Sequence, residues 1–505
     1  MLDTLARSAM LCHELRFRPP MNLSAHLGSL AAFAHIAITV AFAVRALMQR
    51  HPPSTTLAWL LLIVGVPYLG AALYLLIGER QLGRRRGRHA NMLLPLLVDW
   101  VRALPPEILS KQNRDARWSS IRRTAQGAAG LPSTIGNRLS LRHDSGQILR
   151  DIAADIDAAA HTVLMEFYIW HPGGNADVVG DALIRAAQRG VACRILLDAV
   201  GSGEFFRSDW PKRLRSGGVA VVETLSVGLL RAAFVRFDLR LHRKIVVVDG
   251  LVAWTGSLNL VDPRYFKKEA GVGEWVDAMA RIEGPVVEML AGVVLWDWCV
   301  ETGEPLATVA PGLAEVVATP IAGGAEVQVL PSGPGFEGIS AHRLLLATLY
   351  AAREEIVLTT PYFVPDEPLF LALEAAALRG VAVTVIVPAK VDSILVRHAS
   401  RWSFEPLLAA GVQILQFNDG LLHTKSVTVD RSLALFGTTN LDIRSFRLNF
   451  EVTLVVYDVP FVAELRAVQD SYAQTAQPLD AAAWSRRSTR ARLAESAAHL
   501  VSPLL

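Results

Sequence analysis

Cysteine is scarce in this chain. Only Cys12, Cys193 and Cys299 occur among its 505 residues. This odd and widely spaced set excludes a small disulfide scaffold and favours buried free thiols. Charged residues are also few, at 19%, whereas hydrophobic residues make up 52%, a balance too apolar for an ordinary soluble protein. We therefore expect a large globular protein of about two to four domains with a membrane segment.

An excess of positive or negative charge is missing too. The 50 Lys and Arg residues nearly balance the 47 Asp and Glu residues, and the formal net charge is +3. A nuclease is expected to carry a basic groove with interleaved aromatic residues. The balanced charge therefore argues against a nucleic-acid partner.

Two long apolar stretches are present near the N-terminus. Leu27–Val44 and Leu57–Ile77 contain 18 and 21 residues without a charge, enough for each to cross about 30 Å of hydrocarbon as a helix. Arg50–Ser54, between them, contains two prolines, which is typical of a tight turn. The sequence therefore predicts a transmembrane helical hairpin over residues 26–78, after an N-terminal extension over residues 1–25. A cleaved signal peptide and a buried core hairpin are the alternatives.

Two local features refine the predicted hairpin. Gly65 and Pro67 lie inside the second stretch and predict a kink there, without ending the helix. Arginines flank both stretches, and the positive-inside rule then predicts both ends of the hairpin in the cytoplasm. These arginines are Arg7, Arg16 and Arg18 before the first stretch, Arg45 and Arg50 near the turn, and Arg80, Arg84, Arg85, Arg86 and Arg88 after the second.

The rest of the chain repeats one order of strand-like and helix-like patterns. The apolar run Thr162–Ile169 matches Ile356–Phe363, and each run is followed by a helical stretch that ends in Arg-Gly-Val, at Arg189 and Arg379. Strands that alternate with helices predict an α/β protein with a largely parallel sheet, and the two copies predict an internal duplication. The predicted segments are a basic juxtamembrane segment and connector over residues 79–133, a first domain over residues 134–320, a second over residues 321–478, and a C-terminal helical tail over residues 479–505.

Each half contains one copy of the pattern His-x-Lys-x4-Asp-x6-Gly-Ser/Thr-x-Asn. The first copy is His242, Lys244, Asp249, Gly256, Ser257 and Asn259, and the second is His423, Lys425, Asp430, Gly437, Thr438 and Asn440. At about 5% usage per residue type, one such pattern arises by chance on the order of once in a hundred thousand chains of this length. Two copies at matching places are therefore not accidental.

The pattern favours chemistry on a phosphoryl group. Strand alternation places a His and a Lys two residues apart on one face, where Lys neutralises an oxyanion and His attacks phosphorus or carries a proton. A solvated strand edge is the alternative for a single copy, and the duplication disfavours it. Two histidines can divide the work, one as neutral nucleophile and one as protonated acid. Further donors to phosphate oxygens are Ser257, Asn259, Thr438 and Asn440.

Four acidic residues have separate predicted roles. Asp277 and Glu451, at corresponding places downstream, are candidates to orient the imidazoles by accepting a hydrogen bond from the second ring nitrogen. Asp249 and Asp430 belong to the repeated pattern but stand close to turns. A structural role is therefore favoured for them over a catalytic one.

Both copies resemble the His-Lys-Asp signature of the phospholipase D superfamily, and the chain is most similar to its bacterial cardiolipin synthases. The similarity covers most of the chain and includes Arg240–Gly250, Thr360–Asp366 and Asn440–Glu451. The resemblance implies two tandem phospholipase D-like α/β/α sandwich domains, related by pseudo-twofold symmetry and preceded by the hairpin. It also implies a multi-pass protein of the bacterial inner membrane, with its catalytic domains on the cytoplasmic side.

The activity implied by the resemblance is a two-step phosphatidyl transfer without a metal or other cofactor. A histidine attacks one phosphatidylglycerol and releases glycerol, and a hydroxyl of a second phosphatidylglycerol then accepts the phosphatidyl group. By analogy His242 is the nucleophile and His423 the acid, although the repeat itself leaves this choice open. The other implied roles are phosphate binding by Lys244 and Lys425, assistance by Asn259 and Asn440, and orientation of the imidazoles by Asp277 and Glu451.

Three alternatives remain at this point. The same site could hydrolyse a phospholipid, because water and alcohols compete for one intermediate, or it could use another alcohol as acceptor. A membrane-bound scaffold with an inactive site is disfavoured because every position of the pattern is intact. The expected partners are therefore a phospholipid substrate and the bilayer, with no nucleic acid and with an oligomeric state that is open.

Overall fold

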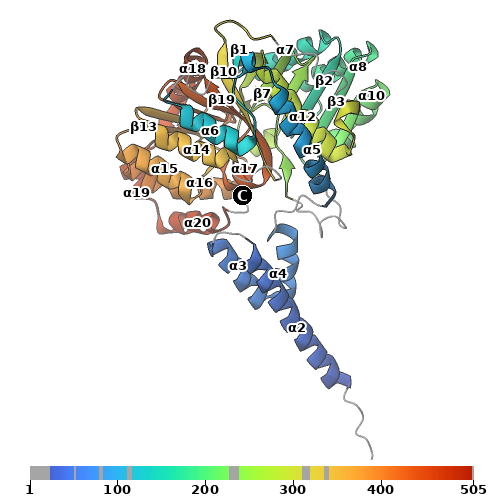
Figure 1. Ribbon diagram of the computed structural model, residues 1–505. Coiled ribbons are helices and arrows are strands. Elements are labelled where there is room, and N and C mark those ends of the chain that lie inside the picture. Colours follow the sequence, from blue (N-terminus) through green and yellow to red (C-terminus); the bar gives the residue numbers. More distant parts are fainter. Residues whose placement is uncertain are drawn as a thin grey trace, which may run out of the picture. The chain divides into compact units, whose positions relative to one another are not determined.

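The computed structural model describes residues 23–49, 53–78, 84–110, 116–226, 238–309, 319–334 and 340–502. The chain divides into a small helical unit within residues 1–80 and a large unit that begins at Gln81 (Figure 1). Most of the predicted N-terminal extension, over residues 1–22, lies outside the described residues. So do residues 50–52 of the predicted turn.

The small unit consists of consecutive helices. They are α2 (Leu23–Met48), α3 (Pro53–Gly65), α4 (Pro67–Leu73) and the π-helical turn η1 (Tyr74–Gly78). The predicted kink is instead a break between α3 and α4, where Val66 has φ −139° and ψ 72°. A residue before proline disfavours helical backbone, so Pro67 begins a new helix.

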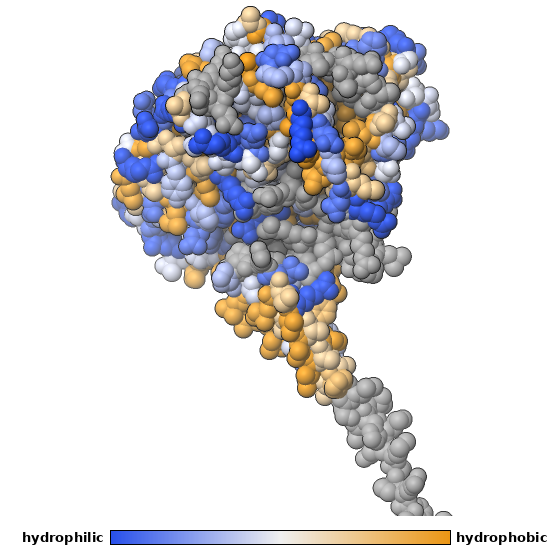
Figure 2. Space-filling model, in the orientation of Figure 1, coloured by the Kyte–Doolittle hydropathy of each residue, from blue (hydrophilic) through white to orange (hydrophobic). Residues whose placement is uncertain are grey.

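The predicted transmembrane hairpin is not confirmed. None of the helices in the described part of the chain combines the length and the apolarity that crossing a bilayer requires. Several large apolar side chains of α2 are nevertheless exposed, and Figure 2 shows an apolar surface over α2–α4. These exposed side chains are Phe33, Ile36, Val40, Val44 and Leu47.

One continuous sheet runs through the large unit, in the order β20-β14-β13-β11-β16-β17-β19-β10-β1-β9-β7-β6-β2-β3-β4. At its centre β1 (Thr134–Arg142) pairs antiparallel with β10 (Ala325–Ser332). The same sequence of strands follows outward on both sides, which confirms the duplication. The first half contributes β9 (Met279–Glu283), β7 (Val252–Gly256), β6 (Ile245–Val248), β2 (Thr162–Phe167), β3 (Ala192–Asp198) and β4 (Ala220–Thr224). The second contributes β19 (Asn449–Tyr457), β17 (Leu433–Gly437), β16 (Ser426–Val429), β11 (Glu355–Thr359), β13 (Ala382–Pro388), β14 (Gln413–Phe417) and the edge strand β20 (Ala476–Pro478).

The sheet is mixed, which corrects the prediction of a largely parallel one. Strands β2, β3 and β4 are parallel to one another, as are β11, β13 and β14. The strands nearer the centre pair antiparallel, and short turns join the pairs β6–β7 and β16–β17, whereas longer connections join the others. The turn between β6 and β7 places Asp249 and Gly250 at φ 51° and 68°, and such left-handed pairs are typical of two-residue hairpins.

Helices cover both faces of the sheet in three layers. In the first half α7 (Ser145–Asp157), α8 (Asn175–Gln188) and α10 (Trp210–Ser216) enclose one core with one face. In the second half α14 (Ser340–Ala351), α15 (Glu367–Leu378) and α16 (Ile394–Ala409) do the same. The opposite face carries α12 (Val286–Thr302) and α18 (Val459–Thr475), which share a single core with strands of both halves.

The predicted connector and tail are integral parts of the large unit. Helix α5 (Arg84–Ala103) packs on α12, and the indole of Trp100 donates to Glu288 at 3.0 Å. Helix α6 (Ser119–Ala129) packs on α14. Helix α20 (Thr489–Leu500) of the tail packs on α16, where the rings of Trp402 and His499 stack 3.6 Å apart. These contacts extend the folded body beyond the predicted domain boundaries.

Candidate active site

Each His-x-Lys segment follows a two-residue strand that pairs with the opposite half. Strand β5 (Arg240–Leu241) runs parallel to the start of β19, and β15 (Leu421–Leu422) runs parallel to β8 (Trp275–Val276). The next backbone N–H groups continue these contacts, because His242 donates to the carbonyl of Phe450 at 2.9 Å and His423 to that of Val276 at 2.8 Å. Both histidines are therefore held against the other half of the molecule.

The two histidines and two lysines do not lie within regular strands. Residues 242–244 connect β5 to β6, and residues 423–425 connect β15, which belongs to a separate two-stranded sheet, to β16 of the main sheet. The strand alternation that predicted a shared face therefore does not apply. Instead each lysine folds back, and its ammonium donates to the carbonyl oxygen of the histidine two residues earlier. The distance is 2.7 Å for Lys244 and 2.6 Å for Lys425.

A carboxylate from the opposite half contacts each imidazole. Nδ1 of His242 lies 2.9 Å from Oε2 of Glu451, and Nδ1 of His423 lies 2.6 Å from Oδ1 of Asp277. Because a carboxylate accepts, Nδ1 is the donor, and this tautomer leaves Nε2 of a neutral imidazole free to attack or to take a proton. The pairing is crosswise, since each half supplies the carboxylate for the other half's histidine.

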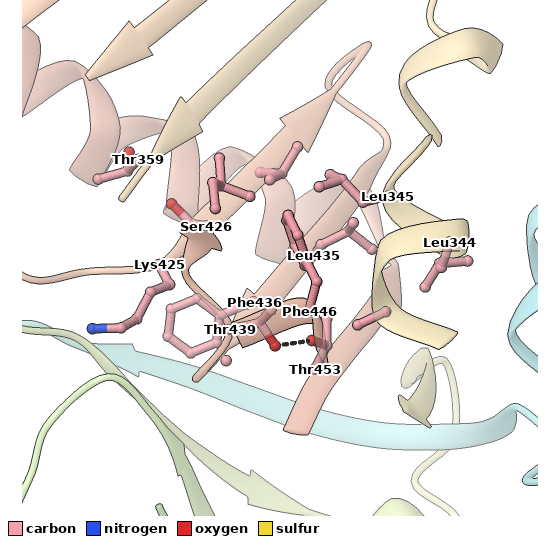
Figure 3. Close-up of a pocket in the computed structure, with 14 residues that line it drawn as sticks. Leu344, Leu345, Thr359, Lys425, Ser426, Leu435, Phe436, Thr439, Phe446 and Thr453 are labelled. Carbon is pink, nitrogen blue, oxygen red and sulfur yellow. Dashed lines mark hydrogen bonds between the residues drawn. The ribbon is translucent and has the colours of Figure 1, made fainter. Parts of the chain in front are cut away.

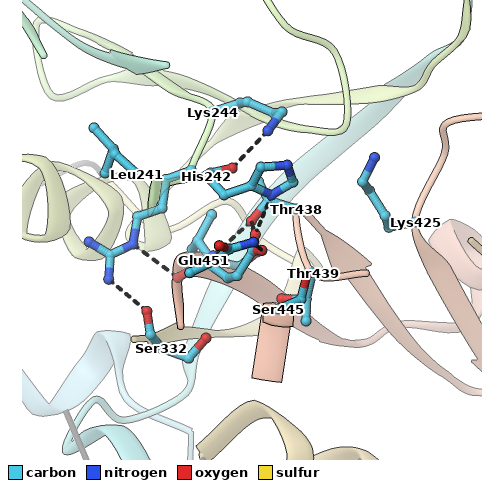
Figure 4. A network of polar contacts seen from close by, with 12 residues as sticks. Leu241, His242, Lys244, Ser332, Lys425, Thr438, Thr439, Ser445 and Glu451 are labelled. Atoms are coloured by element: carbon cyan, nitrogen blue, oxygen red, sulfur yellow. Dashed lines mark hydrogen bonds and ion pairs between the residues drawn. The ribbon is translucent and has the colours of Figure 1, made fainter. Parts of the chain in front are cut away.

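The hydroxyl groups of the two copies hold the carboxylates. Oγ of Ser257 donates to Asp277 at 2.6 Å, and Oγ1 of Thr438 donates to Glu451 at 2.6 Å. Figure 4 shows Thr438 and His242 converging on Glu451, with Lys244 and Lys425 nearby. Ser257 and Thr438 were predicted as donors to phosphate. Their hydroxyl hydrogens are already used, so the structure ties them to the carboxylates instead.

Two glycines allow this close approach. A Cβ atom on Gly256 would lie 2.3 Å from the carbonyl oxygen of Ala278, and one on Gly437 would lie 2.3 Å from that of Val452. Both distances are far shorter than van der Waals contact, so any side chain would push the strands apart. Glycine therefore brings the adjacent hydroxyl residue within reach of its carboxylate.

Both histidines and both motif asparagines line one cavity of about 300 Å³. The amide nitrogen of Asn259 and the amide oxygen of Asn440 are buried and have no hydrogen-bond partner among the residues that the structure describes. Unpaired polar atoms of this kind are costly unless a ligand satisfies them. Aromatic rings flank the imidazoles, with Trp275 centred 4.3 Å from His423 and Tyr168 centred 5.0 Å from His242.

Burial makes the charged forms of the central groups unfavourable. Burial, reinforced by the neighbouring lysines and opposed by the carboxylates, lowers the pKa of His242 to about 4 and that of His423 to about 3. Burial also lowers the pKa of Lys244 to about 8 and holds that of Lys425 well below its usual range. Both imidazoles are therefore neutral at pH 7. A bound phosphodiester opposes this preference, because its negative charge favours the protonated form of its neighbours.

Comparison with known proteins agrees with this geometry. The family model described as "Cardiolipin synthase, PLD-like domain" matches residues 152–272 and 345–472, and a phospholipase D-nuclease N-terminal model matches residues 37–79. A cardiolipin synthase A of Salmonella arizonae is 46% identical over 463 residues, which cover 91% of this chain and 95% of the relative. The corresponding protein of Erwinia tasmaniensis is 45% identical over 478 residues, or 94% and 98% of the two chains.

The chain belongs to the cardiolipin synthases. Their phospholipase D-like fold is also visible in a solved structure, that of phosphatidylserine synthase from Haemophilus influenzae Rd KW20. This structure matches with a TM-score of 0.56 over 76% of the present chain and 100% of its own, at 16% identity. That likeness supports the fold alone.

Two acidic members of the signature shared with the cardiolipin synthases lie outside the cavity. The carboxylate of Asp249 accepts from the backbone N–H groups of residues 160, 161 and 162, at 2.7 to 2.8 Å. That of Asp430 accepts from residues 353, 354 and 355, and it also pairs with Arg117. Each aspartate thus joins a hairpin turn to the segment that leads into the neighbouring strand.

A second, much smaller cavity lies behind Lys425. It has a volume of about 30 Å³ and lies between α14 and the strands β16 and β17 (Figure 3). Its walls are mainly apolar and include Leu344, Leu345, Leu435 and Phe436. The space is too small for a lipid headgroup. Its apolar walls help to explain why burial lowers the pKa of Lys425.

Sequence reasoning missed several residues of the main cavity. They are Tyr168, Arg240, Trp275, Tyr362, Asp442 and Arg444. Tyr168 and Tyr362 occupy matching places in the two repeated runs, shortly after β2 and β11, and this repetition was a usable signal. In the described ranges no three His, Cys, Asp or Glu side chains lie close enough together to hold a metal ion.

Proposed function

We propose that this enzyme makes cardiolipin by transferring a phosphatidyl group from one phosphatidylglycerol to another and releasing glycerol. The observation that carries the proposal is the pair of imidazoles on one cavity, each backed by a carboxylate from the opposite half and lying close to a buried lysine. This arrangement supplies a nucleophile, an acid and charge neutralisation for a phosphodiester. The identity to named cardiolipin synthases over nearly the whole chain supports the same choice.

In the first step the donor phosphodiester lies between the histidines, with its charge balanced by Lys244 and Lys425. Nε2 of His242 attacks phosphorus, and the bond from phosphorus to the glycerol oxygen breaks. Protonated His423 gives its proton to that oxygen, so glycerol leaves neutral. The assignment of His242 as nucleophile follows the family resemblance. Its greater side-chain exposure supports the assignment, at 10% against 3% for His423.

In the second step His423 acts as a base. It removes a proton from a terminal hydroxyl of the second phosphatidylglycerol, whose oxygen attacks phosphorus. The bond from phosphorus to His242 breaks, which restores the free imidazole and yields cardiolipin. Asn259 completes the cradle through its unpaired amide nitrogen, which can donate to a phosphate oxygen, whereas the unpaired amide oxygen of Asn440 accepts and therefore suits a hydroxyl of the substrate.

We further propose that residues 26–78 attach the enzyme to the bacterial inner membrane. The exposed apolar side chains of α2 to α4 and the flanking arginines support this attachment. A multi-pass arrangement with the catalytic unit on the cytoplasmic side remains a prediction from the arginine distribution.

The deciding experiment uses purified full-length protein in detergent with labelled phosphatidylglycerol, without CTP or added metal. We expect cardiolipin and glycerol from the unmodified enzyme, and neither product from His242→Ala. His143→Ala replaces an exposed histidine and is the matched control that keeps activity. Phosphatidic acid as the sole lipid product would instead identify a hydrolase. Transfer only after another alcohol is added would identify a different acceptor.

A further inference from the structure

Two arginines line the main cavity on one side, one from each half. Arg240 belongs to β5 and Arg444 to α17 (Ile443–Arg447). The guanidinium of Arg240 donates to the carbonyl of Leu239, and that of Arg444 donates to the carbonyl of Asp238. Both arginines are therefore held by one two-residue segment and line the same cavity.

No carboxylate in the described part of the chain forms an ion pair with either arginine. The nearby carboxylates accept hydrogen bonds from backbone N–H groups instead. Asp198 accepts from the N–H groups of residues 200, 201 and 241, and Asp442 accepts from the N–H of Ser445 at the start of α17. Asp198 acts electrostatically on Arg240 and Asp442 on Arg444. Neither carboxylate forms a direct ion pair with its arginine, so each guanidinium can still make a charge-assisted contact with a bound anion.

The two arginines break the symmetry of the duplicated site. The position two residues before the motif histidine is Arg240 in the first half and Leu421 in the second. The position four residues after the motif asparagine is Pro263 in the first half and Arg444 in the second. The histidines and lysines are present twice because both copies act on one phosphorus. Arg240, in contrast, has an apolar counterpart. The first half does carry an arginine two residues after an aspartate, Arg264 after Asp262, but it pairs with Asp262 and does not line the cavity. Arg240 and Arg444 therefore serve something that is bound on one side only.

The arginines also lie close to the reacting centre. Burial raises the pKa of Tyr168, and both guanidinium groups act on its phenol in the opposite direction. The ring of Tyr168 is centred 5.0 Å from that of His242. An anion held by Arg240 and Arg444 is therefore next to the histidine pair, and it is separate from the charge that the lysines neutralise.

Transfer between two phospholipids brings two phosphodiesters into the site, of which only the donor's reacts. We propose that Arg240 and Arg444 bind the unreactive phosphodiester of the acceptor phospholipid. They thereby select a phosphate-bearing alcohol over water or free glycerol. The inference rests on the proposed function, since only a phospholipid acceptor brings a second phosphate.

The test separates acceptors with and without a phosphate. Full-length enzyme and the variants Arg240→Gln and Arg444→Gln are assayed in detergent for cardiolipin formation and for exchange of labelled free glycerol into phosphatidylglycerol. The exchange uses the same donor but an acceptor without phosphate. Loss of a charge-assisted contact is expected to reduce cardiolipin formation about tenfold or more per arginine, with exchange changed by less than about threefold. Arg444→Lys should keep part of the activity, and Arg138→Gln, at an exposed arginine, is the matched control.

Two results would overturn the inference. A parallel loss of cardiolipin formation and glycerol exchange would show that the arginines serve the donor step or the fold. Unchanged cardiolipin formation in both variants would show that they bind no acceptor phosphate. Failure of the proposed function is visible separately, because the unmodified enzyme would then exchange glycerol or hydrolyse lipid without forming cardiolipin.

Discussion

Each reactive imidazole depends on a carboxylate far away in the sequence. The separation is 209 residues between His242 and Glu451 and 146 residues between His423 and Asp277. Neither carboxylate lines the cavity. Each acts on the ring, whose tautomer and orientation it sets, and on the imidazolium, whose charge it stabilises. Thr438 and Ser257 hold these carboxylates from the other side.

Removing these acceptors is expected to lower kcat with little change in KM. In Glu451→Gln and Asp277→Asn the charge that stabilises the imidazolium is lost, and general acid–base catalysis typically contributes about 100-fold to 10,000-fold. Steady-state kinetics with phosphatidylglycerol in mixed micelles measures both parameters. Asp470→Asn on the exposed surface of α18 is the matched control. An effect confined to KM would mean that the carboxylates bind substrate and do not orient the rings.

The lowered pKa values of the histidines predict acid sensitivity of the fold. In the folded state the pKa of His242 is about 4 and that of His423 is about 3, whereas the ordinary pKa of histidine in the unfolded chain is 6.5. Between pH 6.5 and about 4 the unfolded state therefore binds more protons, and the free energy of unfolding falls as the pH falls. Thermal unfolding at pH 7, 6 and 5 should show a weaker pH dependence in the double variant His242→Gln and His423→Gln. Equal slopes would contradict the assigned shifts.

At the scale of elements, the shortest strands determine the site. The sequence predicted both histidines and both carboxylates but did not predict which would pair. The pairing depends on β5 and β15, which contain two residues each and are too short for a recognisable pattern. Arg240 and Arg444 could not be predicted as site residues for a related reason, because a single arginine beside apolar residues is common. Only comparison of the two halves makes them conspicuous.

Helix α6 shows how much of the fold lies in a segment predicted to be a connector. Its Arg122 forms two hydrogen bonds with Glu326 of β10, at 2.7 and 3.0 Å, and the two side chains are 6% and 5% exposed. Glu326 also accepts from Ser133 at 2.9 Å. A buried, fully bonded pair of this kind fixes a helix to the central strand.

Breaking that pair is expected to be strongly destabilising. Arg122→Met leaves the carboxylate of Glu326 buried without its charged partner, which typically costs about 3–5 kcal/mol. Replacing both residues, as in Arg122→Met with Glu326→Leu, should cost less. The exposed pair of Arg138 and Glu283 is the matched control, and Arg138→Met should cost under about 1 kcal/mol. Denaturant unfolding of the four proteins measures the differences, and equal losses at the two sites would refute the argument.

At the scale of the whole molecule, the two domains behave as one body. The central pairing of β1 with β10 joins their sheets, and one core packs α12 and α18 against strands of both halves. The duplication and the α/β class could be predicted because two strands of each half, the helical stretch between them and the repeated motif are visible in the sequence. The single sheet could not, because the contact between β1 and β10 occurs once and has no repeated counterpart. The predicted transmembrane hairpin is not confirmed, and its second apolar stretch is divided at Val66, because the residue before Pro67 disfavours helical backbone.

The joined halves predict that one chain forms one complete site. The carboxylate for His242 and the carboxylate for His423 both come from the same chain, through strands β19 and β8. A mixture of inactive His242→Ala and His423→Ala proteins should therefore show no more activity than the sum of the two alone, whether mixed after purification or produced together. Unmodified enzyme diluted with either variant is the control for inhibition by the mixture. Recovered activity would require halves from two chains to assemble, which would show that the crosswise pairs form between molecules.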